Sequence, residues 1–158
     1  MKESAAQAQD AAAGGTTQPN VCFGCGEANA AGMHLEFSRD EEKRRVLGRF
    51  RLQERYQGAP GMAHGGIIAL VLDEALGKVS RFYEARAVTA ELNVEYLRPV
   101  RVGVEIQVEA HQERAEGRNF FHVGEIRDAA GRVLARGRGR FVVVDPERYR
   151  RANGLDRD

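Results

Sequence analysis

The stretch that decides the fold is GMAHGGIIALVLDEALG, residues 61–77, in which an apolar segment carries two adjacent acids. Residues 64–80 have the length and composition of one helix that is apolar on nearly all sides. Such a helix needs cover on most of its surface. At 100° per residue, Asp73 shares a stripe with Gly66 and Gly77, whose small size leaves space beside the carboxylate.

Segments in which apolar and polar residues alternate lie on both sides of this helix. Two precede it and four follow it, near residues 33–38, 46–52, 88–96, 102–110, 118–126 and 132–144. A period of two indicates strands of an antiparallel sheet with one solvated face. In the third strand, Val88, Ala90 and Leu92 are expected to share one face. This order predicts an α+β domain in which one curved antiparallel sheet wraps one long central helix.

The ends of the chain lack periodicity, so the domain is expected to span residues 20–145. Residues 1–19 are predicted to be a disordered tail, and residues 146–158 a charged tail. The net charge of +1 and the lack of a long apolar run give no indication of a nucleic-acid or membrane partner. The N-terminus does not resemble a secretory signal, and with two cysteines this predicts a cytoplasmic location.

The two acids of the helix are expected to differ in role. Glu74 precedes Lys78 by four residues, which favours a solvated ion pair. Asp73 has no cation at helical spacing, so burial should raise its pKa and make it a candidate general base or nucleophile. The alternative is a carboxylate that only accepts a hydrogen bond from a neighbouring loop.

The start of the helix is a candidate site for a carbonyl oxygen. Backbone N–H groups in the first turn lack partners within the helix, and glycine lets a ligand approach them closely. Gly65 and Asp73 are eight residues apart, or about 12 Å along a helix, so one acyl group cannot easily contact both in one chain. An antiparallel helix from a second copy would bring the two groups together, which favours a homodimeric site.

The segment HGGIIALVLDEALG, with TAELNVEYLRPV after it and CFGCGEANAAGMHLEF before it, resembles the hotdog-fold acyl-CoA thioesterases of the PaaI-like, 4-hydroxybenzoyl-CoA thioesterase superfamily. The resemblance covers residues 21–144. It implies a hotdog fold, hydrolysis of an acyl-CoA, a homodimer or homotetramer, and no metal or other cofactor.

The resemblance also implies roles for individual residues. The amide of Gly65 would polarise the thioester carbonyl, and Asp73 of the partner subunit would be the base or nucleophile. Thr89 matches a hydroxyl residue that orients the attacking water in some members. His64 mostly supports the start of the helix in this family.

Substrate contacts are expected from the same region and from strand ends. Some family members carry an Asn where this chain has Gly58, so the neighbouring Gln57 is the candidate replacement. Gly66, the second glycine of the helix start, is also expected to contact the substrate. Arg98 and Arg118 lie at predicted strand ends, where cations can meet the phosphates of coenzyme A.

Two further motifs are predicted to be structural. Cys22 and Cys25 form a C-x-x-C, but a structural zinc ion takes four ligands and no second cysteine pair exists, so a tight loop with small buried thiols is favoured over a metal or redox site. In ARGRGRF, residues 135–141, the arginines alternate with small residues, which predicts a strand with a basic outer face and a small inner face.

Two other functions remain open on this fold. A hydratase or dehydratase would use a His paired with an acid, and only His64 lies near the expected site. A non-catalytic acyl-CoA-binding protein would not need a buried acid. The acyl specificity and the choice between dimer and tetramer are not set by any motif.

Overall fold

The computed structural model describes residues 19–155, so the N-terminal tail expected for residues 1–19 lies, but for Pro19, outside the described residues. Two strands precede the long helix and four follow it, as predicted. The elements in chain order are β1 (Phe37–Asp40), β2 (Arg45–Arg51), the 3₁₀ turn η1 (Glu54–Tyr56), α1 (Gly65–Val79), the 3₁₀ turn η2 (Ser80–Tyr83), β3 (Ala87–Tyr96), β4 (Glu105–Glu116), β5 (Asn119–Asp128), β6 (Val133–Val143) and α2 (Pro146–Ala152).

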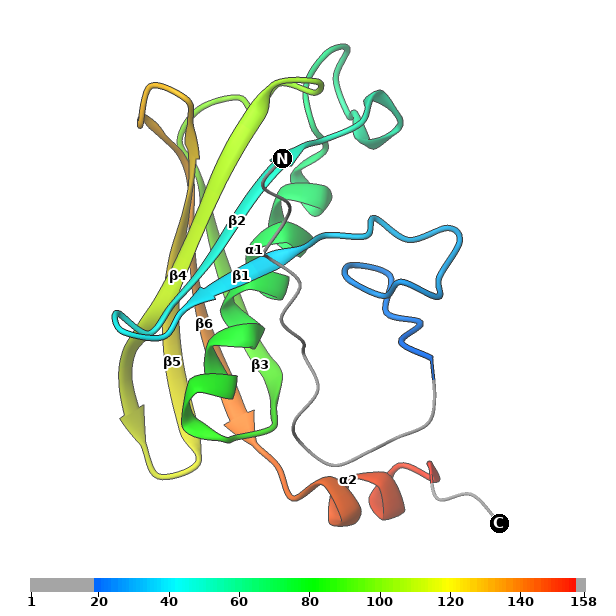
Figure 1. The fold of residues 1–158 in the computed structure, drawn as a ribbon, viewed down its shortest axis with the longest axis vertical. Coiled ribbons are helices and arrows are strands. Elements are labelled where there is room, and N and C mark those ends of the chain that lie inside the picture. The colour runs from blue at the N-terminus through cyan, green and yellow to red at the C-terminus, as the bar shows by residue number, and fades with distance from the viewer. Residues whose placement is uncertain (1–18, 156–158) are drawn as a thin grey trace, which may run out of the picture.

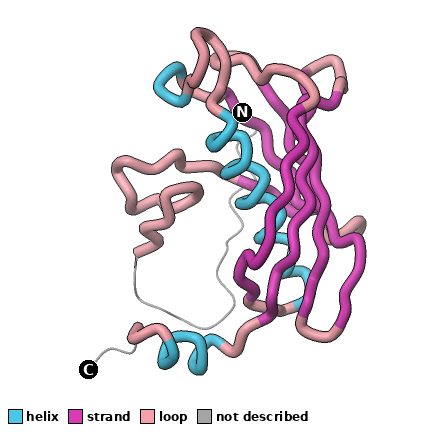
Figure 2. The backbone as a smooth tube through the Cα atoms, turned by 180° about the vertical axis from the view of Figure 1, so that it is seen from behind, coloured by secondary structure: helices cyan, strands magenta, loops and turns pink. Residues whose placement is uncertain are grey.

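The six strands form one antiparallel sheet in the order β1-β2-β4-β5-β6-β3. The sheet curves around α1, which lies along its inner face (Figures 1 and 2). β1 and β3 are the two edge strands, so among residues 19–155 each has one side without a neighbouring strand. The fold is the α+β arrangement that the sequence predicts, one long helix wrapped by a curved antiparallel sheet.

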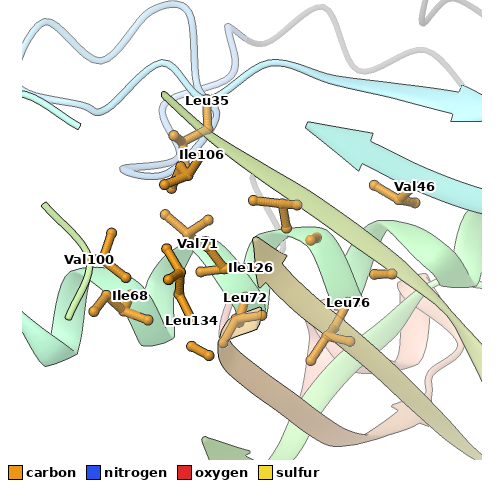
Figure 3. Packing of buried hydrophobic residues seen from close by; sticks show 14 of the residues in the cluster. Leu35, Val46, Ile68, Val71, Leu72, Leu76, Val100, Ile106, Ile126 and Leu134 are labelled. Atoms are coloured by element: carbon orange, nitrogen blue, oxygen red, sulfur yellow. The ribbon is translucent and has the colours of Figure 1, made fainter. Parts of the chain in front are cut away.

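The core lies between α1 and the sheet. Val71, Leu72 and Leu76 of α1 are fully buried and pack toward the sheet together with Ile106 and Ile126 (Figure 3). Burial of a side chain of this size contributes roughly 1.5–3 kcal/mol. The helix is therefore fixed to the sheet mainly by its apolar face.

Strand β3 contains a β-bulge at Ala90. Thr89 pairs with Phe141, but the next paired residue is Glu91, so Ala90 is extra. Because directly paired residues share a face and Phe141 is buried in the core, Thr89 lies on the helix side of β3. Val88, the neighbour of Thr89, therefore lies on the opposite face, so the prediction that it shares the face of the later apolar residues of this strand is wrong.

The C-terminal segment is not wholly aperiodic, because it begins with the short helix α2. Asp145 is its N-cap, and its carboxylate accepts a hydrogen bond from the Arg148 N–H at 2.8 Å. Pro146 follows at the first helical position, where its missing N–H costs nothing. The helix buries none of its residues and extends away from the end of β6 (Figure 1). Within residues 19–155, no helix is long and apolar enough to cross a membrane.

Candidate active site

Asp73 lies in the third turn of α1, half-buried, on the side that faces β3. The Thr89 hydroxyl donates a hydrogen bond to Asp73 Oδ1 at 2.8 Å. Burial raises the pKa of this carboxyl above its usual range, while the Thr89 hydrogen bond opposes the rise and the nearby charge of Glu74 adds to it. The β3 bulge turns Thr89 toward the helix, so it creates this pair.

The first turn of α1 leaves one backbone donor available. His64 is the N-cap, and its Nδ1 accepts a hydrogen bond from the Gly66 N–H at 2.9 Å. The His64 carbonyl accepts from the N–H groups of Ile67 and Ile68. Among residues 19–155, the Gly65 N–H has no acceptor. The structure thus separates the two glycines: Gly65 offers a free N–H, whereas that of Gly66 is already capped.

Tyr96 is a site residue that the sequence analysis did not single out. Its hydroxyl donates to the Gly65 carbonyl oxygen at 2.9 Å, and 54% of the residue is exposed. The ring lies 3.5 Å from the position that a Cβ on Gly65 would occupy. Tyr96 therefore positions the helix start and forms a wall beside the free N–H. Its period-two spacing from Leu92 and Val94, which pack against the core, is the signal that could have found it.

The two groups remain well separated in one chain. Gly65 and Asp73 are eight residues apart on α1, about 12 Å at the rise of an α-helix. Their partners Tyr96 and Thr89 both come from β3, the edge strand. Two hollows on the surface lie elsewhere, one lined by β1, β2 and β4 and the other by β3 to β6, and neither includes Gly65 or Asp73. Because Thr89 and Tyr96 are both exposed, the candidate site of a single chain lies at the protein surface, along α1 and β3.

The loop before α1 holds Gln57 and Gly58 beside the helix start. The Gln57 side-chain oxygen accepts a hydrogen bond from the Gly61 N–H at 2.9 Å. The Gly58 N–H donates to the Met62 carbonyl, and a Cβ on Gly58 would lie 3.2 Å from His64 Cα. These contacts shape the loop, and they place both residues next to the N-cap rather than next to Asp73.

The two arginines chosen for phosphate contacts lie far apart. Arg98 donates to the carbonyl of Val133, the first residue of β6, and Arg118 donates to that of Val143, the last. An eleven-residue strand is about 33 Å long. Arg98 follows Tyr96 closely and so lies at the Gly65 end of the domain, whereas Arg118 lies at the opposite end.

The basic face of β6 is neutralised by neighbouring acids. Its inner positions Gly137 and Gly139 are buried, as the alternation predicts, and its arginines point outward. Each arginine is within ion-pair distance of a carboxylate: Arg136 with Glu125 at 2.8 Å, Arg138 with Glu113 at 3.8 Å and Arg140 with Glu91 at 3.5 Å.

Glu74 differs from its prediction. Its ion pair with Lys78 is present at 4.0 Å, but their side chains are only 18% and 15% exposed, so the expectation of a solvated acid is wrong. The cause is the loop that carries Cys22 and Cys25, which covers this side of α1. The Cys22 thiol donates to Glu74 at 3.3 Å, and burial together with Glu74 raises the pKa of Cys25 to about 11.

His122 is a buried titratable group that the sequence analysis missed. It is 0% exposed, and its Nδ1 donates to the Leu76 carbonyl of α1 at 2.8 Å. The ring stacks on Phe141 at 4.9 Å. Burial lowers the pKa of His122 to about 4. Because the ring is sealed between α1 and the sheet, it cannot contact a substrate.

Comparisons with known proteins point to one family. Residues 60–135, which include Gly65 and Asp73, match the family model described as the thioesterase superfamily. The chain is 31% identical over 116 residues to acyl-coenzyme A thioesterase THEM4 of Bos taurus, over 73% of this chain and 47% of that protein. It thus spans about half the length of the THEM4 relatives.

Solved structures place the fold in the same group. Protein RHA08564, a thioesterase superfamily protein, is 32% identical with a TM-score of 0.68, over 72% of this chain and 58% of that chain. A hypothetical thioesterase from Streptococcus pneumoniae TIGR4, solved with coenzyme A, has a TM-score of 0.65 at 18% identity, over 71% and 90% of the two chains. The part of the chain that carries the candidate site is a hotdog-fold domain of the thioesterase superfamily.

Proposed function

We propose that this protein hydrolyses the thioester of an acyl-CoA to a free acid and coenzyme A. The observation that carries the proposal is the pair of groups on α1. A half-buried carboxylate with a raised pKa and a backbone N–H that has no acceptor among residues 19–155 both lie along α1, within the segment that matches the thioesterase superfamily. These are the two groups that acyl transfer to water needs, a base or nucleophile and an oxyanion donor.

The Gly65 N–H would donate a hydrogen bond to the thioester carbonyl oxygen. The positive end of the α1 dipole adds to this field, so negative charge that develops on the oxygen is stabilised. Tyr96 fixes the donor because it holds the carbonyl of the same residue. His64 has a positioning role, since its Nδ1 is used by the Gly66 N–H. The loop contacts of Gln57 and Gly58 shape the same end of the cleft.

Asp73 would act in one of two ways. As a general base, it takes a proton from a water molecule as the water oxygen bonds to the carbonyl carbon, and the C–S bond then breaks to release the CoA thiolate. As a nucleophile, its oxygen displaces the thiolate and forms an acyl-aspartyl anhydride, which water then hydrolyses. Thr89 lies beside the carboxylate in either route and would orient it and the water.

A homodimer would complete the site, with Asp73 from one chain facing Gly65 from its partner. Three observations support this. The two groups are about 12 Å apart within one helix. Their partners lie on the unpaired edge strand β3. Thr89 and Tyr96, which contact these groups, are exposed in one chain. Antiparallel pairing of two β3 edges would set the two α1 helices side by side and give two equivalent sites per dimer.

Acyl-CoA is the substrate class that the relatives suggest. THEM4 is named an acyl-coenzyme A thioesterase, and the structural neighbour from Streptococcus pneumoniae was solved with coenzyme A. Arg98 lies at the Gly65 end of the domain and Arg118 at the Asp73 end, so in the proposed dimer both are candidates for a phosphate contact. The two unbridged cysteines support a reducing, cytoplasmic setting.

The test is thiol release from short, medium, long and aromatic acyl-CoAs by the full chain and by Asp73→Asn. We expect turnover of at least one class by the wild type and a large loss of kcat in the variant, with its helix content and oligomeric state unchanged. Wild-type binding of acyl-CoA without turnover would instead establish the non-catalytic binding protein. Addition of water to an enoyl-CoA without thiol release would establish the hydratase.

A further inference from the structure

Three metal-ligating side chains come together on the face of α1 that carries Glu74, next to the face that carries Asp73. The Sγ atoms of Cys22 and Cys25 and a carboxylate oxygen of Glu74 all lie within 4.8 Å of one another. The cysteines belong to the loop before β1, and Glu74 belongs to α1. This loop lies beside the helix in Figure 1. The sequence disfavours a metal site because it holds no second cysteine pair, whereas the fold adds a carboxylate to the first pair.

The loop is shaped around this carboxylate. A Cβ on Gly24 would lie 2.6 Å from Cδ of Glu74, and a Cβ on Gly26 would lie 2.4 Å from the Cys22 backbone nitrogen. Glycine at both positions lets the loop close tightly, with a hydrogen bond of 2.9 Å from the Gly26 N–H to the Cys22 carbonyl. The Glu74 side chain enters the space that a side chain at position 24 would fill.

The donor set fits a thiophilic divalent cation. Two sulfurs at C-x-x-C spacing and one carboxylate oxygen suit Zn²⁺, and its bond lengths set ligand atoms about 3.6–3.8 Å apart in a tetrahedron. The donors are already within 4.8 Å of each other, so a small closure would form three bonds. Two thiolates, a carboxylate and Zn²⁺ carry a net charge of −1, and the ammonium of Lys78, 4.0 Å from Glu74, offsets it.

We propose that Cys22, Cys25 and Glu74 bind one Zn²⁺ ion, with water in the fourth position, and that the ion fastens the N-terminal loop to α1. The ion would not take part in thioester hydrolysis, because Asp73 points to β3 whereas Glu74 points to the loop. Its role is to hold residues 20–36 against the helix. The same thiols hydrogen-bond to the carboxylate when no ion is bound.

The test uses full-length protein kept reduced under argon, with free thiols verified by titration. After treatment with a chelator, the protein is dialysed against Zn²⁺, and bound zinc is measured by elemental analysis and by competition with a chromophoric indicator. We expect one Zn²⁺ per chain. With Co²⁺ in its place, thiolate-to-metal charge-transfer absorption should appear.

The variants separate this site from adventitious binding. Cys22→Ser and Cys25→Ser should each weaken Zn²⁺ binding by at least about 100-fold, since even the loss of an outer-shell partner costs 10–100-fold. Glu113→Gln, which alters an exposed acid elsewhere, is the matched control and should bind as the wild type does. Gly24→Ala leaves both thiols in place but should displace the Glu74 carboxylate, so it should weaken binding as Glu74→Gln does.

Gly24→Ala and Glu74→Gln also serve as the test if a cysteine variant fails to fold, as judged by circular dichroism. The proposal is overturned if the reduced wild type binds less than one equivalent of Zn²⁺. It is overturned equally if the cysteine, Gly24→Ala and Glu74→Gln variants that fold bind Zn²⁺ as tightly as the wild type.

Discussion

Asp73 and His122 are both titratable groups beside α1, but they occupy opposite surroundings. His122 is 0% exposed between the Phe141 ring and the Leu76 carbonyl, under the centre of the sheet. Asp73 is half-buried beside Thr89 on β3, where the sheet ends. Burial shifts the pKa of each group toward its neutral form, upward for the acid and downward for the base.

The difference between them is access. A perturbed pKa marks a functional group only when a ligand can reach the group. His122 lies between two packed layers and contributes to the core, whereas Asp73 lies at an edge where a second chain could supply the missing wall. The candidate catalytic group of this domain therefore lies beside the edge strand, whereas the titratable group under the centre of the sheet is part of the core.

Asp73→Asn should produce the largest effect on activity. The amide can neither accept the proton of water nor form an anhydride, so kcat/KM should fall by about 10²–10⁴. Glu91→Gln, on the outer face of the same strand, is the matched control for loss of one negative charge. Thiol release from the best acyl-CoA measures both. Equal activity of Asp73→Asn and Glu91→Gln would show that Asp73 is not a catalytic residue.

Gly65→Pro should remove the oxyanion donor without harming the fold. Proline lacks the N–H, is favoured at the first helical position, and follows His64, whose ψ of 139° suits a residue before proline. We expect kcat to fall by about 10²–10³. Gly65→Ala keeps the N–H and places its Cβ at an ordinary 3.5 Å from Tyr96, so it should lose far less. A Gly65→Pro variant as active as Gly65→Ala would exclude this N–H as the donor.

His122 should govern stability at acid pH and not activity at neutral pH. Its pKa is about 4 in the folded chain and near 6.5 when unfolded, so the unfolded state binds the extra proton between these values. The contribution is fully present above pH 6.5 and is lost as pH falls toward 4, by about 3 kcal/mol in all.

His122→Gln keeps a donor for the Leu76 carbonyl but does not titrate. Its free energy of unfolding, from urea curves at several pH values, should fall less steeply than that of the wild type between pH 6.5 and 4. Parallel pH profiles for the two proteins would show that the histidine is not the buried neutral group described here.

Thr89→Val should give the smallest effect, visible in the pH profile. The Thr89 hydrogen bond lowers the pKa of Asp73, so its loss raises that pKa further. Because Asp73 must be ionised, the acid limb of kcat against pH should move to higher pH, with most activity kept above it. Thr89→Ser retains the hydroxyl, so its acid limb should lie at the same pH as that of the wild type. An unmoved limb in the valine variant would separate Thr89 from the ionisation of Asp73.

Much of the fold follows from the sequence, because alternation and helical spacing report which residues are buried together. The helix was expected at residues 64–80 and spans Gly65–Val79. The bulge at Ala90 could not be predicted, since one extra residue leaves the apolar pattern nearly intact while it reverses the faces at one end of the strand. Only the resemblance placed Thr89 at the site.

Long-range contacts account for the remaining differences. Glu74 has the sequence of a solvated i,i+4 pair, and only the folded loop shows that the cysteines cover it. The Gly65 and Gly66 amides look equivalent in the sequence, yet the His64 cap distinguishes them. The Asp145-Pro146 pair, in contrast, was a readable start signal for α2.

The most direct test of the account mixes two defective chains. Gly65→Pro and Asp73→Asn proteins are unfolded together, refolded and assayed for thiol release. If each site takes Gly65 from one chain and Asp73 from the other, half of the dimers are mixed and each has one intact site, so the mixture should recover about a quarter of wild-type activity. If it stays as inactive as the separate variants, although mixed dimers form, both groups act within one chain and the account of a shared site is wrong.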